Sequence, residues 1–539
     1  MFCLSDLNPL ELFAAYLSRQ LTFDIYAIRY LLSIVLGYPI AIIYVLLIRD
    51  RGARACNTYI FLTGFILSFW NFGLDVIHLF AGIALTISTL RICGPTSTAV
   101  AMTFMLNMVY LLTGYYLVNY GTYDINWTMP YCILCLRLIG FAWDYRDGAL
   151  PETKLSEYQK SVAFTGIPSP LEILAFCFVP TACFVGPQFS WRHYQSFIDQ
   201  TLRPAVVLKN RTFIQKYFRN PKLHRTLSRL ATGILFMILH VASRGFVSME
   251  YMLTDVFLKK SNFFYRLGYM IAFSQFLIMR YLCIWLFSEG SCILMGLGCT
   301  GNVHVQYLNG SQPSSQPKNY TGTVNTSTFR KTAVLGGGGA TMDYDFQALE
   351  KDVLEGRAVV TEADHTKCAN ISVVRFQSAT NTDLLVSSFN INTNKWMLEY
   401  VYKRLRFLGN KQLSQIITLL FLSVWHGFYS GYYVNFFLEF ITVYAEKEFL
   451  YIVRRSIYAD FLYNTLPGKI LTSVMGKLHA LFLLACPLCA FSLLRANLWI
   501  PVLSSVYFIG FIYLLWPLVR PLVKRLFPRK PEAEAKKDS

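Results

Sequence analysis

A histidine with glycine and aromatic neighbours is the first candidate for chemistry in this sequence. Residues 424–433 read Val-Trp-His-Gly-Phe-Tyr-Ser-Gly-Tyr-Tyr, and His426 stands between two apolar runs. The glycines at 427 and 431 let another backbone or a ligand approach closely. A neutral imidazole, with an ordinary pKa of about 6.5, can take a proton from an alcohol, whereas carboxylates are weaker bases. The pattern indicates a general base for acyl transfer to a hydroxyl.

A run of asparagines is the second candidate. Residues 388–396 read Ser-Phe-Asn-Ile-Asn-Thr-Asn-Lys-Trp, with asparagines at 390, 392 and 394. A side-chain amide both donates and accepts hydrogen bonds, so it can orient a hydroxyl or stabilise an oxyanion. Asparagine and threonine are also common in turns and at helix N-caps. The residues alone favour this second interpretation.

Several ionisable residues lie within or beside apolar runs, where a charge is costly and often functional. A buried pair between helices, or a place near the membrane interface, is the alternative for each of them. These residues are Asp75, His78, His240, Arg280, Glu289, His426 and Glu439.

The composition places these residues in a membrane protein. Of the 539 residues, 54% are hydrophobic and only 15% are charged, and the mean hydropathy is +0.40. Average globular domains carry about 25% charged residues. These values exclude a disordered, collagen-like or disulfide-scaffold chain and indicate a polytopic membrane protein. Residues 1–24 lack a basic segment followed by a small-residue cleavage site, so we expect no removable signal peptide.

The charge and the cysteines add little specificity. The formal net charge is +18, but the basic residues flank apolar runs, which favours a cytoplasmic membrane surface over nucleic acid. The 13 cysteines include two Cys-x-x-Cys pairs, at 132–135 and 486–489. Both pairs lie in apolar runs without a nearby His or Cys cluster, so we expect buried apolar side chains and no metal site.

Apolar runs recur along most of the chain and predict roughly ten or eleven spans, because about 20 residues cross a bilayer. Some runs are shorter, and these are expected to be re-entrant, buried or merged. The runs cover residues 26–48, 57–71, 73–90, 96–118, 131–143, 170–185, 231–246, 263–287, 413–425, 427–444, 470–494 and 499–519.

Two polar segments interrupt or end this pattern. Residues 304–366 include four consecutive glycines and a Ser-Gln-Pro-Ser-Ser-Gln-Pro stretch, and we expect an inert flexible insertion. A regulatory site or a glycosylated luminal loop are the alternatives. Lys536 and Lys537 stand third and fourth from the final residue. They resemble a dilysine signal for retrieval to the endoplasmic reticulum, which requires a cytosolic C-terminus.

An ordered set of motifs resembles the membrane-bound O-acyltransferase family, and its lysophospholipid branch in particular. The motifs cover nearly the whole chain outside the insertion. They are Leu-Gly-Tyr-Pro (36–39), Asn-Phe-Gly (71–73), Trp-Thr-Met-Pro (127–130), Val-Gly-Pro-Gln-Phe-Ser (185–190), Glu-Gly (289–290), Gly-Leu-Gly (296–298), Ser-Phe-Asn-Ile-Asn-Thr-Asn (388–394), Lys-Arg-Leu (403–405), Phe-Leu-Gly-Asn-Lys (407–411) and Trp-His-Gly (425–427).

The resemblance implies an all-α fold, with tilted membrane helices forming a cage around a central tunnel. It also implies transfer of a fatty acyl group, polyunsaturated in phospholipid remodelling, from acyl-CoA to the sn-2 hydroxyl of a lysophospholipid. The choline, ethanolamine and serine head groups all stay open as acceptors. Acyl-CoA is a co-substrate, and no cofactor is expected. The implied partners are membrane lipids and possible copies of the same chain, in the endoplasmic reticulum membrane.

The resemblance also assigns the site residues. The catalytic histidine of the family corresponds to His426. Its catalytic asparagine corresponds to Asn390, with Asn392 and Asn394 as the near alternatives. The candidate substrate-binding residues are Asn392, Asn394, Trp425, Gly427 and Glu289.

The expected organisation has five parts. They are an N-terminal segment (1–25), an N-terminal membrane part (26–303), the insertion (304–366), a catalytic part with both motifs (367–519) and a basic tail (520–539). Other acceptors, namely a sterol, diacylglycerol or a protein, are alternatives within the enzyme class. A lipid transporter or scramblase that uses the intramembrane charges is the alternative outside it. No internal repeat supports it, although transporters often have one.

Overall fold

The computed structural model describes residues 9–118, 125–201, 221–300, 302–307, 321–325, 332–335, 341–342, 355 and 358–530. The chain divides into two compact units. Unit 1 comprises Met1–Ile234 and Cys283–Ala369, and unit 2 comprises Leu235–Leu282 and Asn370–Ser539. The two long helices α12 (Pro221–Ser243) and α14 (Phe263–Met295) contribute residues to both units. Residues 235–282, which precede the insertion, therefore belong with the part that carries both motifs.

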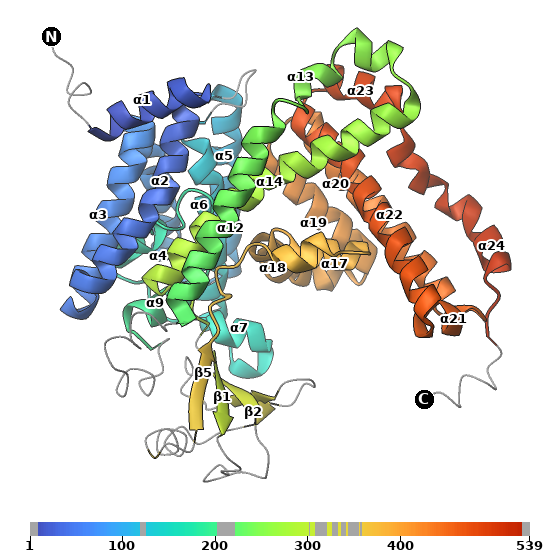
Figure 1. Cartoon of the computed structure of the whole chain (residues 1–539). Coiled ribbons are helices and arrows are strands. Elements are labelled where there is room, and N and C mark those ends of the chain that lie inside the picture. Colours follow the sequence, from blue (N-terminus) through green and yellow to red (C-terminus); the bar gives the residue numbers. More distant parts are fainter. Residues whose placement is uncertain are drawn as a thin grey trace. The chain divides into compact units, whose positions relative to one another are not determined.

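Unit 1 begins with a series of helices, drawn from dark blue to green-blue in Figure 1. They are α1 (Pro9–Leu21), α2 (Ile25–Ile43), η2 (Tyr44–Ile48), η3 (Arg49–Arg51), α3 (Ala53–Phe72), η4 (Gly73–Val76), α4 (Ile77–Cys93), α5 (Ser97–Val118), α6 (Thr128–Gly148), η5 (Glu152–Lys154), α7 (Glu157–Val162), α8 (Pro170–Cys177) and α9 (Trp191–Ile198).

Local sequence signals set several of these helix ends. Ser169 and Glu172 form a capping box at the start of α8, and Pro170 occupies its first turn. Each side chain satisfies a backbone N–H that the helix itself leaves without a partner. Helix α3 lies between Gly52 (φ 88°) and Gly73 (φ 55°). These backbone angles are open to glycine at little cost, so the chain changes direction at both ends.

A buried arginine organises the centre of unit 1. Arg137, on α6, is 3% exposed. Its guanidinium donates to the carbonyl oxygens of Phe176 (3.1 Å), Cys177 (3.3 Å), Ala182 (3.2 Å) and Pro187 (3.1 Å). A buried cation is stable only when such partners replace its hydration. Arg137 therefore fixes the irregular segment after α8, which contains the Val-Gly-Pro-Gln-Phe-Ser motif.

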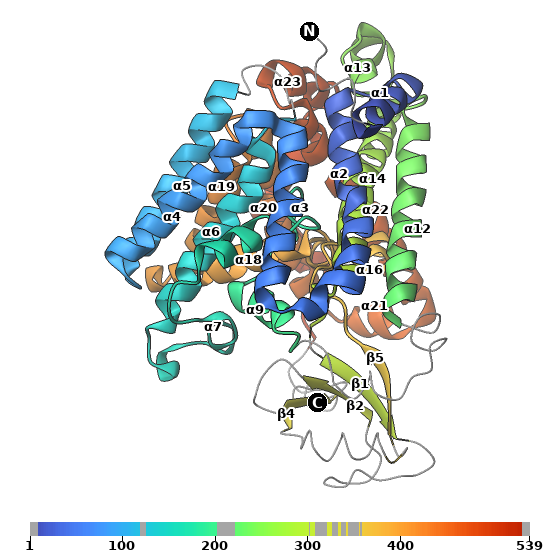
Figure 2. The same cartoon turned by 90° about the vertical axis from the view of Figure 1, so that its left-hand side faces the viewer.

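The insertion contains antiparallel strands in its described parts. Strands β1 (Asn302–Tyr307), β2 (Thr321–Asn325), β3 (Thr332–Leu335), β4 (Thr341–Met342) and β5 (Ala358–Ala363) form one sheet in the order β4-β3-β2-β1-β5. Figure 2 shows β1, β2 and β5 side by side. Backbone pairing thus joins the described parts of the insertion despite their polar composition. The expectation of an inert, flexible insertion stays a prediction.

Unit 2 contains the ends of α12 and α14 together with a further series of elements. They are α13 (Met249–Met252), η6 (Val256–Lys260), α16 (Val373–Gln377), α17 (Thr382–Ser388), α18 (Ile391–Tyr400), η7 (Tyr402–Leu408), α19 (Lys411–His426), α20 (Ser430–Val453), α21 (Ala459–Asn464), α22 (Leu466–Leu493), α23 (Ala496–Ser505), η8 (Ile509–Leu515) and α24 (Trp516–Leu526).

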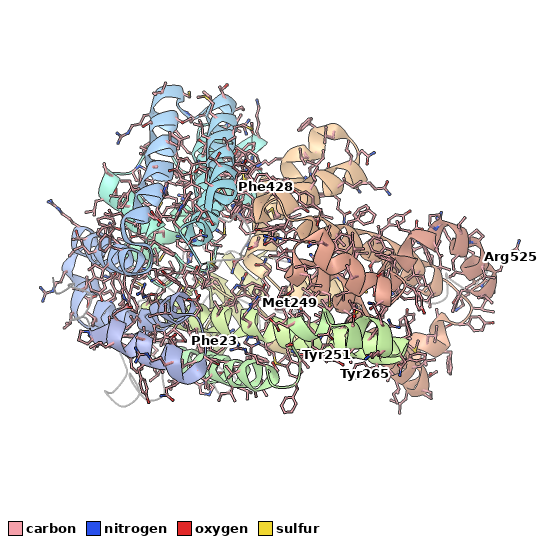
Figure 3. The ribbon with its side chains drawn as sticks, turned by 90° about the horizontal axis from the view of Figure 1, so that it is seen from above. Phe23, Met249, Tyr251, Tyr265, Phe428 and Arg525 are labelled. Atoms are coloured by element: carbon pink, nitrogen blue, oxygen red, sulfur yellow. The ribbon has the colours of Figure 1, made fainter. Side chains whose placement is uncertain are left out.

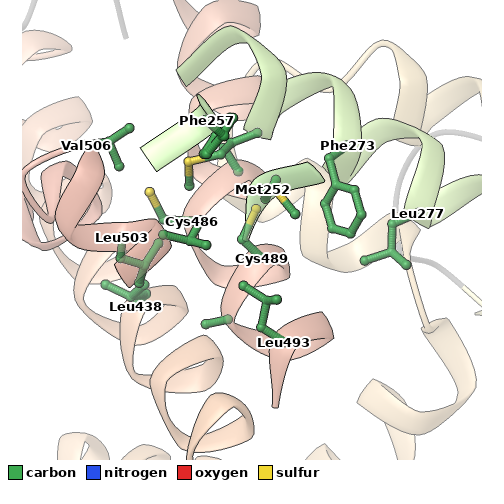
Figure 4. Packing of buried hydrophobic residues seen from close by; sticks show 14 of the residues in the cluster. Met252, Phe257, Phe273, Leu277, Leu438, Cys486, Cys489, Leu493, Leu503 and Val506 are labelled. Carbon is green, nitrogen blue, oxygen red and sulfur yellow. The ribbon is translucent and has the colours of Figure 1, made fainter. Parts of the chain in front are cut away.

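The hydrophobic core of unit 2 joins α13, η6, α14, α20, α22 and α23 (Figure 4). Met252 and Phe257 are fully buried in it, as is Cys489, and Cys486 is 1% exposed. Their burial confirms the expectation that this Cys-x-x-Cys pair packs as apolar side chains. In the other pair Cys135 is buried and Cys132 is partly exposed.

The apolar helices make the chain a multi-pass membrane protein. Six helical stretches of the described residues are long and apolar enough to cross a bilayer. A seventh results if the bent pair Ala496–Ser505 and Ile509–Leu526, with a 79° bend, counts as one span. The six stretches are Ile25–Arg51, Ala53–Cys93, Ser97–Val118, Lys222–Ser243, Phe263–Met295 and Leu466–Leu493. The predicted polytopic all-α membrane fold is thus confirmed, and the described strands are confined to residues 302–363.

The number of spans in the described residues is lower than the ten or eleven predicted from the apolar runs. The runs 57–71 and 73–90 lie in one stretch, Ala53–Cys93, and run 170–185 forms a helix of only eight residues, Pro170–Cys177. Helix α19 has 16 residues, and α20 carries several charged side chains. Apolar composition alone counted each of these runs as a span, whereas the lengths and charges of the observed helices give fewer candidate spans.

Candidate active site

His426 is the last residue of α19, which is not one of the six membrane-crossing stretches. The helix ends there because Gly427 has φ 123° and ψ −166°, a conformation essentially restricted to glycine. The glycine in the Trp-His-Gly motif therefore has a backbone role: it stops the helix and places the imidazole at its end. The next residue, Phe428, is 57% exposed and is labelled in Figure 3.

Aromatic rings surround the imidazole on several sides. The ring centroids of Tyr432 and Phe436, both on α20, lie 5.4 and 5.5 Å from that of His426. Phe491, on α22, contributes a third ring at 5.5 Å, edge-on. The indole of Trp425 is buried and lies 4.6 Å away. These apolar neighbours hold the imidazole in one place without an ion pair.

This environment keeps the imidazole neutral. Burial lowers the pKa of His426 below its ordinary value, because an apolar surrounding disfavours the charged form. The residue as a whole is partly exposed. Among the described residues, none hydrogen-bonds a ring nitrogen of His426. The arrangement therefore leaves a neutral nitrogen available to accept a proton.

The backbone of α22 and of the residue after it holds the start of α20, just after His426. An ideal Cβ at Gly431 would lie 2.1 Å from the carbonyl oxygen of Ala490, on α22. The backbone N–H of Gly431 also donates to the Leu494 carbonyl at 2.8 Å. The expectation that glycine permits a close approach is confirmed at this position, where the approaching group is the backbone of another helix.

Asn390 precedes α18 and has a left-handed backbone conformation, with φ 48° and ψ 43°. Asparagine adopts this region more readily than most residues with a side chain. Its side chain does not cap α18. Instead, its Oδ1 accepts a hydrogen bond from Nδ2 of Asn370 at 3.2 Å. Asn390 therefore occupies the N-cap position of α18, as the turn-or-cap interpretation expects, but its side chain makes no capping hydrogen bond.

The other two asparagines have different positions. Asn394 donates from Nδ2 to the carbonyl oxygens of Val386 (3.0 Å) and Phe389 (2.9 Å), so both amide hydrogens are engaged. Asn392 donates its backbone N–H to Oδ1 of Asn370 at 3.0 Å. Asn394 thus supports the turn between α17 and α18. Because the amide hydrogens of Asn394 are engaged within the protein, Asn390 is better placed than Asn394 for chemistry.

An aromatic contact ties the asparagine helix to the histidine helix. The rings of Trp396, on α18, and Phe421, on α19, stack at 6.2 Å. Asn390 precedes Trp396 by less than two helical turns, and His426 follows Phe421 by less than two turns. Both candidate catalytic residues thus lie in unit 2, and a ring contact joins the helix that follows Asn390 to the helix that ends at His426.

Glu289 does not join this group. It belongs to unit 1, is fully buried and pairs with Arg229 at 2.7 Å. Its second oxygen has no partner among the described residues. Its predicted substrate-binding role stays a prediction, and the ion pair is the alternative that the sequence left open.

The remaining ionisable candidates are in varied settings. His78 contacts the hydroxyl of Tyr110 at 2.7 Å and stacks on Trp127 at 4.0 Å. His240 donates to the Phe276 carbonyl at 3.1 Å. Asp75, in η4, and Arg280, in α14, are exposed, and Glu439 is half-buried on α20. We assign Asp75, Arg280 and Glu439 no role in the candidate site around His426 and Asn390.

Two further predictions concern a metal site and the dilysine retrieval signal. The described ranges contain no group of three or more His, Cys, Asp or Glu side chains that could hold a metal ion. Lys536 and Lys537 lie outside the described residues, so the retrieval signal stays a prediction.

Sequence reasoning missed two residues that hold the asparagine segment. Asn370 is 6% exposed and contacts both Asn390 and Asn392. Glu446, on α20, accepts hydrogen bonds from the backbone N–H and the hydroxyl of Thr382, at the start of α17. No local signal marks either residue, because each acts on a segment distant in sequence.

The fold and this site define a polytopic helical membrane protein with a histidine at the end of one helix and an asparagine at the start of another, both in the same unit. The profile of MBOAT, the membrane-bound O-acyltransferase family, matches residues 112–480. Since the match covers more than half of the chain, the chain belongs to the membrane-bound O-acyltransferase family.

Similar proteins from animals match nearly the full length. The chain is 33% identical to lysophospholipid acyltransferase 5 of Bos taurus over 507 residues. The aligned region covers 94% of this chain and 91% of the relative. The human protein of that name is 32% identical, with 94% and 90% covered. The Drosophila melanogaster protein of that name is 30% identical over 497 residues, with 91% and 86% covered.

Proposed function

We propose that this chain is a lysophospholipid acyltransferase, which moves a fatty acyl group from acyl-CoA to the sn-2 hydroxyl of a lysophospholipid. The names of the relatives support the lysophospholipid acceptor, and membership of the family supports O-acyl transfer. The acceptors are lysophosphatidylcholine, lysophosphatidylethanolamine or lysophosphatidylserine, and the donor chain is polyunsaturated.

In the proposed reaction, a ring nitrogen of His426 takes the proton of the sn-2 hydroxyl. The hydroxyl oxygen attacks the thioester carbonyl, and a C–O bond forms while negative charge develops on the carbonyl oxygen. Collapse of this intermediate breaks the C–S bond, and CoA leaves as a thiol after it receives the proton. Asn390 orients a reactant or stabilises the oxyanion. No covalent acyl-enzyme is needed, so proximity of the two substrates supplies part of the rate.

The observation that carries this proposal is the neutral imidazole of His426 at the end of α19, with no described hydrogen-bond partner and three flanking aromatic rings from α20 and α22. Such a ring can act as a base at pH 7. Asn390, at the start of α18, supplies a side-chain amide suited to a developing oxyanion.

The test is acyl transfer by the purified chain in nanodiscs with lysophosphatidylcholine and arachidonoyl-CoA. We expect product from the wild type, and a fall in kcat of roughly 10²–10⁴-fold for His426→Ala, the range for removal of a general base. Phe428→Ala is the control, because this exposed neighbour has no assigned role. Its kcat is expected to stay near that of the wild type.

Two results would contradict the proposal in different ways. Equal activity of wild type and His426→Ala would remove the proposed base while leaving acyl transfer in place. If folded wild-type protein acylates a sterol, diacylglycerol or a peptide in preference to lysolipids, the acceptor is wrong. Lysophosphatidylethanolamine, lysophosphatidylserine and saturated acyl-CoA in the same assay establish the head-group and acyl preferences.

The proposed location is the endoplasmic reticulum membrane, based on Lys536 and Lys537. A fluorescently tagged chain, with the tag in the insertion so that the C-terminus stays free, is expected to co-localise with an endoplasmic reticulum marker. Replacement of both lysines by serine is expected to release part of it to later compartments. An unchanged distribution would show that the dilysine is not the retrieval signal.

A further inference from the structure

Asn370 and the nearby Ser372 hold the asparagine segment through four hydrogen bonds, three of which involve Asn370. The Ser372 backbone N–H donates to the Ser388 carbonyl at 2.9 Å, and the Ile391 N–H donates to the Asn370 carbonyl at 3.0 Å. The Asn370 side chain contacts the Asn392 backbone N–H at 3.0 Å and the Asn390 side chain at 3.2 Å. All these residues belong to unit 2. The two segments are therefore held together on both sides of Asn390.

The chemistry of these contacts fixes which way each amide points. A backbone N–H can only donate, so the atom of Asn370 that faces Asn392 must be its oxygen. The other end of the Asn370 amide is then its NH₂ group, which faces Asn390. An NH₂ group donates, so the atom of Asn390 at 3.2 Å must be its oxygen. The NH₂ group of Asn390 is therefore directed away from Asn370.

We propose that Asn370 is a positioning residue that sets the Asn390 amide so that its NH₂ group faces the reacting atoms as a hydrogen-bond donor. This inference rests on the proposed function and on the assignment of Asn390. Of the two roles proposed above for Asn390, orienting a reactant or stabilising the oxyanion, it selects the second. Asn390 donates a hydrogen bond to the oxygen of the thioester carbonyl, where negative charge develops, and its own oxygen does not accept a hydrogen bond from the substrate hydroxyl.

Burial and backbone conformation support this role. Asn370 is 6% exposed, so water competes little for its hydrogen bonds. Asn390 is held in the left-handed region, which fixes the direction of its Cα–Cβ bond. The rotations about the Cα–Cβ and Cβ–Cγ bonds are then the remaining freedoms, and the hydrogen bond from Asn370 restricts both. A donor that is oriented before reaction stabilises an oxyanion without reorganisation.

Two isosteric substitutions separate the parts of this proposal. In Asn370→Asp, the carboxylate still accepts from the Asn392 N–H but cannot donate to Asn390. The Asn390 amide then turns its NH₂ group toward Asp at 370 and away from the substrate. We expect kcat to fall by at least about tenfold, a part of the 10²–10³-fold lost when an oxyanion donor is removed, with KM nearly unchanged. Asn390→Asp keeps the acceptor for Asn370 but has no donor, and a larger fall is expected.

Asn381→Asp is the matched control. Asn381 caps α17 by accepting from the Leu384 N–H at 2.8 Å, and aspartate accepts in the same way. The same replacement of asparagine by aspartate, here at the start of α17, is therefore expected to leave kcat near that of the wild type. The midpoint of thermal unfolding, measured for every variant, shows that each is folded.

A double-mutant cycle distinguishes positioning from a general structural effect. If Asn370 acts through Asn390, Asn370→Ala lowers kcat in the wild type but changes it by no more than about twofold in the Asn390→Asp background. If Asn370 only supports the fold, the two losses multiply. Multiplied losses would overturn the positioning role.

The remaining outcomes separate this inference from the proposed function. No product from folded wild-type protein overturns both. Full activity of Asn390→Asp overturns the donor role of Asn390 and, with it, that of Asn370. A large loss in Asn390→Asp with full activity in Asn370→Asp overturns the positioning of Asn390 by Asn370 and leaves the proposed function intact.

Discussion

At the scale of single residues, three asparagines of one short motif have three different environments. Asn390 presents its oxygen to Asn370, Asn392 uses its backbone N–H, and Asn394 donates both amide hydrogens to carbonyl oxygens of the preceding turn. Spacing alone could not separate them. The hydrogen bonds do, because a group whose donors are engaged within the protein is not available to a substrate.

Asn394→Asp tests this separation. The aspartate would face the carbonyls of Val386 and Phe389 without a hydrogen to donate. We expect a loss of about 1–3 kcal/mol of stability from the unsatisfied groups. The gain from a negative charge near a helix N-terminus, about 0.3–1 kcal/mol, is smaller. The measurement is the midpoint of thermal unfolding in detergent, with Asn390→Asp as the comparison. A lower midpoint for Asn390→Asp than for Asn394→Asp would contradict this assignment.

At the scale of elements, the site depends on helix ends and on close backbone contacts. Helix α19 ends at His426 because Gly427 turns the chain. Helix α20 starts against the backbone of α22, and the Trp499 indole N–H donates to the Ser430 hydroxyl at 2.9 Å. The loop that follows the histidine is thereby held from both sides, so the position of the imidazole depends on the packing of three helices.

Gly431→Ala tests the contact between α20 and α22. A Cβ would lie 2.1 Å from the Ala490 carbonyl oxygen, so the start of α20 must shift. Forced overpacking costs about 1–3 kcal/mol, and we expect a lower unfolding midpoint and a lower kcat. Gly268→Ala, on α14, is the matched control, since its Cβ would meet no atom within 4 Å. It should be neutral or more stable by up to about 1 kcal/mol. Similar midpoints for both variants would show that the close contact is unimportant.

At the scale of the whole molecule, the chain combines two helical units that are discontinuous in sequence. Unit 1 holds the buried Arg137 and the sheet of the insertion, whereas unit 2 holds Asn390 and His426. The insertion lies in sequence between two parts of the helical chain, and strands β1 and β5 pair at its base, with Tyr307 opposite Ala358. This pairing brings the two ends of the insertion together.

Removal of residues 308–357 tests whether the insertion takes part in catalysis. Because Tyr307 and Ala358 are paired in antiparallel strands, an Asn-Gly turn can join them. We expect kcat and KM for lysophosphatidylcholine and arachidonoyl-CoA close to those of the full chain, measured in nanodiscs. A large change in either constant, in a folded variant, would show that the insertion is part of a substrate or regulatory site.

The sequence by itself determined the class of fold and the motifs that carry the resemblance. Long apolar runs with few charges predict membrane helices, because hydrocarbon excludes polar side chains over a fixed thickness. The Trp-His-Gly and Asn-Ile-Asn-Thr-Asn motifs could be read from residue types alone. The buried Cys486 and Cys489 were also predictable, since they lie in an apolar run without polar partners.

Only the structure decided how the apolar runs form helices and which roles the individual polar residues have. Two neighbouring runs join in one stretch and others form short or charged helices, so the run count exceeded the candidate spans in the described residues. Asn370 and Arg137 carry no local signal, since their partners are distant in sequence. Which amide of the asparagine motif is engaged by the protein, and which way Asn390 points, depends on hydrogen bonds that form only when these segments pack together.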